Sequence, residues 1–261
     1  MNTGNLEEFL NKKVDEFNQP FFIENDPVCI PHLFSKKQDI EISGFFAAIF
    51  AWGNRATIIQ KTKELMQRME MSPYEFCKNY DEKDVKRLKG FKHRTFNEDD
   101  LFYFVEFFHR HYQMSETLET AFVNNEKDAS TPGGGLVGAA LIGFKKYFFS
   151  FEHLKRTEKH ISSPLQKSTC KRLNMFLRWM VRHDKAGVDL GIWSKKISPS
   201  QLICPIDVHV ARVARKFGLL QRKQTDWQAA VELTENLKKL DANDPVRYDF
   251  ALFGMGALEK Y

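Results

Sequence analysis

The chain has 261 residues, 43% of them apolar and 24 of them phenylalanine, so it can bury a sizeable core and its composition excludes an intrinsically disordered protein. Lysine and arginine (39) outnumber aspartate and glutamate (34) by 5, a balance that permits a polyanionic partner without requiring one. The four cysteines are far apart and form no CxxC pair, which indicates reduced thiols and suggests neither a zinc site nor a cysteine-ligated iron–sulfur cluster.

The first eight residues are polar and acidic, whereas a signal peptide has basic residues followed by an apolar run. Nowhere does an uninterrupted apolar run approach the ~18 residues that a membrane-spanning helix needs. We therefore expect a cytoplasmic protein that is not exported and has no membrane partner.

The N-terminal part of the chain has the periodicity of helices. Apolar residues recur at helical spacing over 6–17, and a proline-marked stretch follows, so we expect an arm that crosses onto another part of the protein. The segment 39–52 is apolar on nearly every side, which predicts a helix buried at the centre of a bundle. A polar turn at 53–55 then separates it from a helix over 56–69.

Signals for helix starts divide the rest of the chain. Ser72-Pro73 and Asn97 are typical of helix N-termini, and the segment 136–151 reads as an apolar helix. Thr225-Asp226 and Asp244-Pro245 open two further helices near the C-terminus. Strand patterns of period two with hairpin turns are essentially missing. The sequence therefore predicts an all-α protein.

The stretch 165–182 contains the pattern of an amphipathic helix headed by Lys171. At about 100° per residue, Lys171, Arg178 and Arg182 line up on one side, which we interpret as a cationic stripe facing solvent. The opposite side is expected to pack and carries Leu173, Phe176, Leu177 and Met180.

A second helix is predicted to begin at a carboxylate. Asp207 follows Pro205 at the position of a helix N-cap, and Gly218 supplies the stop signal. The apolar face between them has the spacing i, i+3, i+4, i+7 and consists of Val210, Val213, Ala214 and Phe217.

The lysine and the aspartate make chemical sense together. A lysine attacks an aldehydic sugar carbon only when part of it is unprotonated, which burial and nearby positive charges such as Arg172 and Arg178 favour for Lys171. Loss of a base from a nucleotide develops positive charge on the sugar, so a carboxylate such as Asp207 would stabilise the transition state. Such an enzyme must also take the base out of the stack and hold phosphates.

Several motifs together resemble a known group of enzymes. Lys171 heads a helix, the stretch from Pro205 reads Pro-Ile-Asp-Val-His-Val-Ala-Arg-Val, and residues 249–254 near the C-terminus read Asp-Phe-Ala-Leu-Phe-Gly. Upstream, 46–57 reads Phe-Ala-Ala-Ile-Phe-Ala-Trp-Gly-Asn-Arg-Ala-Thr. These stretches resemble the helix-hairpin-helix DNA glycosylases of the endonuclease III and 8-oxoguanine glycosylase superfamily, over roughly residues 40 to 256. The whole sequence also resembles a group of bacterial proteins of unknown function, which would be a distant branch of that superfamily.

The resemblance implies roles for the matching residues. Lys171 would be the Schiff-base nucleophile and Asp207 the catalytic carboxylate, with no cofactor and no metal. Asn54 would be the residue wedged into the emptied base position. The turn 165–170 would bind phosphate through backbone N–H groups, although Lys167 and Thr169 stand where the superfamily has glycines.

Lys167 could supply charge at this turn instead, and it is also the alternative nucleophile. Nucleic-acid contacts are further expected from Arg55, Arg178, Arg182 and His209. Each of these residues has a simpler reading as well. Asp207 alone is a routine helix cap, His209 packs or holds backbone, and the arginines are ordinary solvent-facing charges.

The first hypothesis is a two-lobed enzyme that removes a damaged base from double-stranded DNA by base flipping. In one form of this hypothesis the damaged base is an oxidised one. The enzyme would act with or without cleavage of the strand at the abasic site. One lobe would be a helical bundle over 36–185, and the other would combine 1–35 with 186–261. The alternative is a non-catalytic helical module that binds nucleic acid. A third reading is a helical scaffold for protein contacts.

Overall fold

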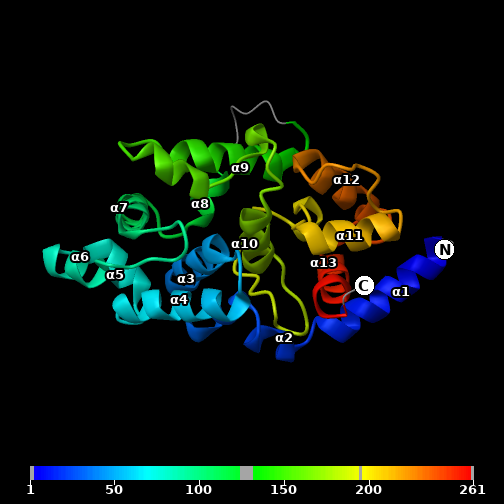
Figure 1. Cartoon of the computed structure of the whole chain (residues 1–261), viewed down its shortest axis with the longest axis horizontal. Coiled ribbons are helices and arrows are strands. Elements are labelled where there is room, and N and C mark those ends of the chain that lie inside the picture. Colours follow the sequence, from blue (N-terminus) through cyan, green and yellow to red (C-terminus); the bar gives the residue numbers. More distant parts are fainter. Residues whose placement is uncertain (1–2, 124–131, 194–195, 260–261) are drawn as a thin grey trace.

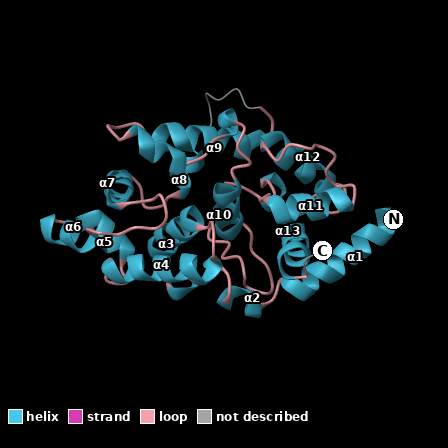
Figure 2. Ribbon diagram, in the orientation of Figure 1, coloured by secondary structure: helices cyan, strands magenta, loops and turns pink. Residues whose placement is uncertain are grey.

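The computed structural model describes residues 3–123, 132–193 and 196–259. In these ranges the protein consists of helices and loops with two isolated β-bridges and no strand, which confirms the all-α prediction (Figures 1 and 2). None of the described helices combines the length and the apolar character needed to cross a membrane. The α-helices are α1 (Thr3–Phe17), α2 (Pro20–Glu24), α3 (Lys37–Phe50), α4 (Arg55–Arg68), α5 (Pro73–Asn79), α6 (Glu82–Leu88), α7 (Glu98–Met114), α8 (Glu119–Val123), α9 (Gly135–Phe148), α10 (Lys171–Val181), α11 (Val208–Lys216), α12 (Trp227–Lys238) and α13 (Tyr248–Phe253).

Helix starts follow the cap residues of the sequence. Asn97 caps α7 by accepting a hydrogen bond from the backbone N–H of Asp100, whose side chain accepts from the N–H of Asn97 in return. Asn54, Asp207 and Asp226 accept backbone hydrogen bonds in the first turns of α4, α11 and α12 in the same way. These caps satisfy N–H groups that would otherwise lack a partner, and so they fix where each helix begins.

Helix α3 lies inside the molecule, and every residue from Asp39 to Phe50 is buried. It packs against α10, α4 and α5, with α10 at the centre of the view in Figure 1. Phe45 at its middle contacts five other phenylalanine rings, with centroids 5.4–6.2 Å apart. This aromatic cluster fixes α10 on α3, and α10 carries the candidate lysine at its first residue.

A buried carboxylate secures the segment that precedes α10. Asp100 is fully buried and accepts hydrogen bonds from Thr157 Oγ1 (2.8 Å), His160 Nε2 (3.1 Å) and Arg156 Nη1 (2.7 Å). Burial opposes ionisation, but the His160 ring and the backbone N–H of Asn97 outweigh it and lower the pKa of Asp100 to about 2. Helix α7 is thereby tied to the short helix Lys155–His160.

The N-terminal helix α1 packs against α13 near the other end of the chain. Tyr248 Oη donates a hydrogen bond of 3.1 Å to Asn11 Oδ1, and Lys13 Nζ lies 2.5 Å from Glu259 Oε1. The apolar face of α1 is buried there and consists of Leu6, Leu10, Val14 and Phe17. The arm therefore does lie on a distant part of the chain, while the division into two lobes stays a prediction.

Candidate functional site

A pocket with a volume of about 420 Å³ lies where α10, α11 and α13 meet the turn after α3. That volume falls within the range of roughly 300–1,000 Å³ usual for small-molecule sites. Its lining combines charged and aromatic side chains, among them Asp26, Trp52, Lys171, Asp207, Asp249 and Phe253.

The structure brings Lys171 and Asp207 together in this pocket. Lys171 is the first residue of α10, Asp207 is the N-cap of α11, and Lys171 Nζ donates a hydrogen bond of 2.7 Å to Asp207 Oδ2. The side chains are 29% and 17% exposed, so the pair is accessible from outside. Their catalytic roles stay predictions, but the amine and the carboxylate share one opening.

Asp207 performs two jobs at once. Its Oδ1 accepts from the backbone N–H groups of His209 (2.9 Å) and Val210 (3.0 Å), which leaves Oδ2 for Lys171. Burial opposes its ionisation, but the Lys171 ammonium and the two N–H donors prevail and hold the pKa of Asp207 below its usual value. The carboxylate is therefore ionised at neutral pH.

The prediction of a cationic stripe facing solvent is wrong for Arg178 and Arg182. Arg178 and Arg182 are each only 4% exposed. Asp189 bridges them, accepting from Arg178 Nε at 3.2 Å and from Arg182 Nη1 at 2.9 Å. Arg178 also donates to Asp249, and Arg182 donates to Asp184 and to Asp244. These guanidinium groups neutralise buried carboxylates, so they are not free to grip a phosphate backbone.

Two further carboxylates line the pocket: Asp249, in the stretch 249–254 that carries part of the resemblance, and Asp26, which no sequence motif suggested. Asp249 on α13 is buried, and desolvation raises its pKa to about 6 despite the neighbouring Arg178. Asp26, the N-cap of the short helix Pro27–Cys29, also has a raised pKa because of burial. Asp26 lies far along the chain from Asp207 and Asp249, so no motif spacing in the sequence could have revealed it.

The predicted wedge lies at the edge of the pocket. Asn54 is exposed between the lining residues Gly53 and Arg55, and its Oδ1 accepts a 3.1 Å hydrogen bond from the N–H of Thr57. Arg55 lines the pocket, and its guanidinium lies 5.4 Å from the ring centroid of Phe253. The turn that precedes α4 thus borders the opening, while the wedge role stays a prediction.

The turn before α10 adopts a strained backbone at two residues that are not glycine. Lys167 has φ 57° and Cys170 has φ 51°, the left-handed region that favours glycine. Lys167 is exposed and is not among the residues that line the pocket, which places the alternative nucleophile outside it. Side-chain oxygens of Ser168 and Thr169 accept from the N–H groups of Cys170 and Lys171.

His209 and one tryptophan complete the site. His209 lines the pocket in the first turn of α11, and its Nδ1 is buried without a hydrogen-bond partner among the described residues. Trp52 lines the pocket too, whereas Trp179 and Trp193 are fully buried in the core. Within ranges 3–123, 132–193 and 196–259, no group of three or more His, Cys, Asp or Glu side chains could hold a metal ion.

Comparison with known proteins identifies a family for this chain but no activity. Residues 26–258 match a family described as "Protein of unknown function (DUF2400)". No curated protein matches the chain, and no solved structure does. The matched range includes every pocket residue discussed above. Because the match spans most of the sequence, the chain belongs to this family of unknown function.

Proposed function

We propose that the protein is a DNA glycosylase that removes a damaged base after the nucleotide has swung into the pocket beside Lys171 and Asp207. The observation that carries the proposal is the 2.7 Å contact between an amine and a carboxylate from two helices at one opening. A nucleotide must leave the stack before such groups can reach its sugar carbon. A pocket of about 420 Å³ with an aromatic wall suits an extruded base.

In the hydrolytic route, the ionised Asp207 faces the sugar. As the bond from C1′ to the base breaks, its electron pair leaves with the base and positive charge grows on the sugar ring, which the carboxylate stabilises. A water polarised by the carboxylate then bonds to C1′, and its proton ends on the departing base. Trp52 and Phe253 supply ring faces beside which the extruded base can stack.

In the covalent route, Lys171 is the nucleophile. The ammonium first gives up a proton, for which Asp207 Oδ2 is the nearest acceptor at 2.7 Å. The free amine then bonds to C1′ while the base leaves with the electron pair of the broken bond and takes the proton held by Asp207. The bond from C1′ to the ring oxygen then breaks, the ring oxygen takes a proton from the nitrogen, and a protonated imine remains. Borohydride adds hydride to that imine and converts it into a stable amine that links protein to DNA.

The turn 165–170 supports contact with the DNA backbone. Within the described ranges, the backbone N–H groups of Ser168 and Thr169 donate no hydrogen bond. They precede the N-terminus of α10, where the helix dipole favours an anion. The exposed Lys167 side chain adds a positive charge to the same turn. A phosphate held there would lie on the helix that carries Lys171.

The test uses duplex DNA that contains an oxidised base or an abasic site, incubated with the protein and borohydride. A covalent adduct is expected for the unaltered protein and none for Lys171→Gln. Lys155→Gln is the matched control, because it removes the same charge from an exposed residue that does not line the pocket and lies outside the turn 165–170. Adduct formation that persists in Lys171→Gln would reject this nucleophile.

Base release is measured in parallel. Asp207→Asn is expected to slow it by about 100- to 10,000-fold. Base release without any adduct would leave the hydrolytic route alone. Binding to DNA with neither product would favour the alternative of a non-catalytic nucleic-acid-binding module, and no binding at low salt would leave a helical scaffold.

A further inference from the structure

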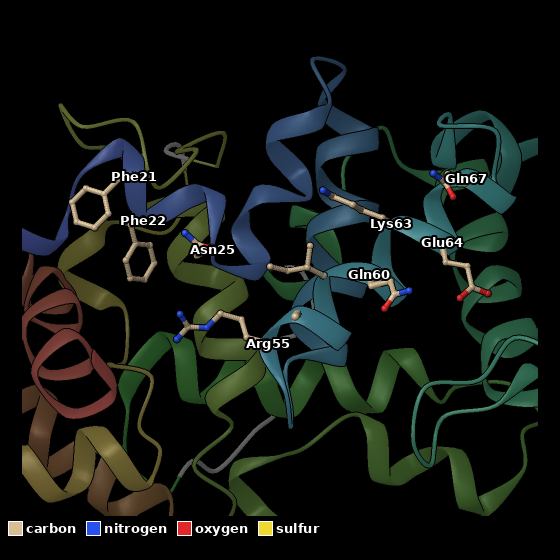
Figure 3. Close-up of a pocket in the computed structure, with 10 residues that line it drawn as sticks. Phe21, Phe22, Asn25, Arg55, Gln60, Lys63, Glu64 and Gln67 are labelled. Carbon is tan, nitrogen blue, oxygen red and sulfur yellow. The ribbon is translucent and has the colours of Figure 1, made fainter. Parts of the chain in front are cut away.

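A second hollow, with a volume of about 1090 Å³, adjoins the candidate site (Figure 3). Phe22 and Arg55 line both it and the Lys171–Asp207 pocket, so the two spaces are neighbours. Helix α2 contributes one wall and α4 the other. We call this space the α2–α4 groove, lined by Phe21, Phe22, Asn25, Arg55, Lys63 and Gln67 among others.

The α4 wall is one face of a helix. Arg55, Ile59, Lys63 and Gln67 recur every four residues, and Figure 3 shows Gln60, Glu64 and Gln67 following the helix away from Arg55. From Arg55 to Gln67 the helix rises by about 18 Å. Extended unpaired nucleotides are spaced more widely than the ~3.4 Å of a strand in duplex DNA, so that length spans at most about five of them. The groove therefore has the reach of a short nucleic-acid strand.

The charges of the groove favour an anionic chain. The side chains of Arg55 and Lys63 make neither a hydrogen bond nor an ion pair within the part of the chain that the structure describes. The groove's acidic residue, Glu64, is engaged by Lys61 Nζ at 2.7 Å and by Arg68 Nη2 at 2.8 Å. Two available cations thus face a space whose carboxylate is already neutralised.

The remaining lining suits nucleobases. Phe21 is 56% exposed and its ring stacks on no other aromatic ring among the described residues, so one face is free for a flat partner. Asn25, Gln60 and Gln67 are exposed amides, which both donate and accept hydrogen bonds as base edges require. In paired DNA the base faces are covered by their neighbours, so stacking on Phe21 requires an unpaired strand.

We propose that the α2–α4 groove binds unpaired nucleotides of a single strand, with Phe21 stacking on a base and Arg55 and Lys63 contacting phosphates. We identify this strand as the one whose nucleotide enters the Lys171–Asp207 pocket, and that identification rests on the function proposed above. Binding of a single strand in the groove does not depend on that function. The occupant is argued from the two available cations and from the continuity of the groove with that pocket.

The experiment measures fluorescence anisotropy of a labelled short oligothymidylate, as DNA and as RNA, with the full chain. Phe21→Ala is expected to weaken binding by about 5- to 150-fold, the range of one lost base stack. The control Leu154→Ala removes a comparably exposed apolar side chain (54%) that does not line the groove, and should not change affinity. Affinity equal to wild type in Phe21→Ala would overturn the proposal.

Salt dependence supplies an independent readout. Lys63→Gln is expected to reduce the slope of log affinity against log salt by about 0.7, whereas Lys155→Gln, an exposed lysine outside the groove, should leave the slope unchanged. An unchanged slope in Lys63→Gln would contradict the assigned phosphate contact. A change in oligomeric state caused by Phe21→Ala would show that a second copy covers the groove, which would also overturn the proposal.

Each of the two proposals can be rejected by experiment without rejecting the other. Adduct formation reports on Lys171, which does not line the groove, whereas oligonucleotide affinity reports on Phe21 and Lys63, which do not line the Lys171–Asp207 pocket. Groove-dependent binding without adduct or base release would reject the glycosylase and keep the groove. Normal adduct formation with unaltered binding in Phe21→Ala and Lys63→Gln would keep the glycosylase and reject the groove.

Discussion

Asp207 shows how one side chain serves structure and proposed chemistry together. Its two oxygens are divided: Oδ1 accepts from backbone N–H groups at the start of α11, and Oδ2 accepts from Lys171 Nζ. A cap needs only a polar acceptor, whereas stabilising a positive sugar needs a negative charge. Substitutions can therefore separate the two jobs.

Asp207→Asn is expected to keep most of the folding stability, because asparagine caps helices as well as aspartate does. Asp207→Ala should lower the unfolding free energy by a further ~1 kcal/mol, the usual value of a lost cap. Base release should be lost in both. Urea unfolding and a glycosylase assay check this. Near-normal base release in Asp207→Asn would show that the residue is a cap alone.

Arg178 is predicted to matter for stability, since it lies buried between Asp189 and Asp249. Arg178→Met is expected to lower the unfolding free energy by about 3–5 kcal/mol, because Asp249 would remain buried without its partner and Asp189 would keep only Arg182. The control is Lys12→Ala, which breaks an ion pair with Glu8 whose side chains are 73% and 70% exposed. That variant should unfold as wild type does; equal loss in both variants would contradict the distinction.

At the scale of elements, the buried Asp100 couples α7 to the short helix Lys155–His160. Its pKa in the folded protein is about 2, below the ordinary value of about 3.9, so the unfolded chain binds the proton more tightly. The resulting stability, about 2 kcal/mol, is present above pH ~4 and is lost as the pH falls towards 2.

Asp100→Asn is therefore expected to lower stability by about 2 kcal/mol at neutral pH and to flatten the decline between pH 4 and 2. Denaturant unfolding across that range measures both effects. Asp15→Asn, at an exposed position in α1, serves as the control and should follow the wild-type curve. An unchanged slope in Asp100→Asn would show that other groups govern the acid response.

Helix positions were predictable because their causes are local. Residue type alone predicts a helix start at Asn97, Asp207 and Asp226, and the structure has a helix cap at each of the three. The environment of α10 was not predictable. Its two arginines at helical spacing look like a solvent-facing stripe, yet their partners Asp189, Asp244 and Asp249 come from segments up to 71 residues away.

Part of the candidate site was predictable for a related reason. Lys171 and Asp207 are each the boundary residue of a strongly patterned helix, and the resemblance supplied their pairing. Asp26, Phe22 and Phe253 were missed, because they reach the pocket through packing of both chain ends around α13. Such long-range packing leaves no periodic trace in the sequence.

For the whole molecule, contact between α1 and α13 joins the two ends of the fold. Gly254 directly follows α13, and a Cβ there would lie 2.3 Å from Phe17 of α1. Gly254→Ala is expected to lower the unfolding free energy by about 1–3 kcal/mol through overpacking. Gly4→Ala, with nothing within 4 Å of the added carbon, should not destabilise the protein.

Thermal and urea unfolding measure the two glycine variants. Restoration of stability by a second change, Phe17→Leu, would confirm that the clash with α1 is the cause. Because α13 also carries Asp249 and Phe253, Gly254→Ala is expected to weaken base release as well. Full stability in Gly254→Ala would contradict tight packing at this junction.

The same junction constrains how the chain can fold while it is being synthesised. The ribosome finishes α1 at Phe17 but makes its cover, α13, only from Tyr248 onward. At about 5–20 residues per second, the delay is roughly 10 to 50 s. Throughout that interval the apolar face of α1 lacks its main native packing partner. A chaperone that shields nascent chains would therefore be expected to engage α1 first and to release it last.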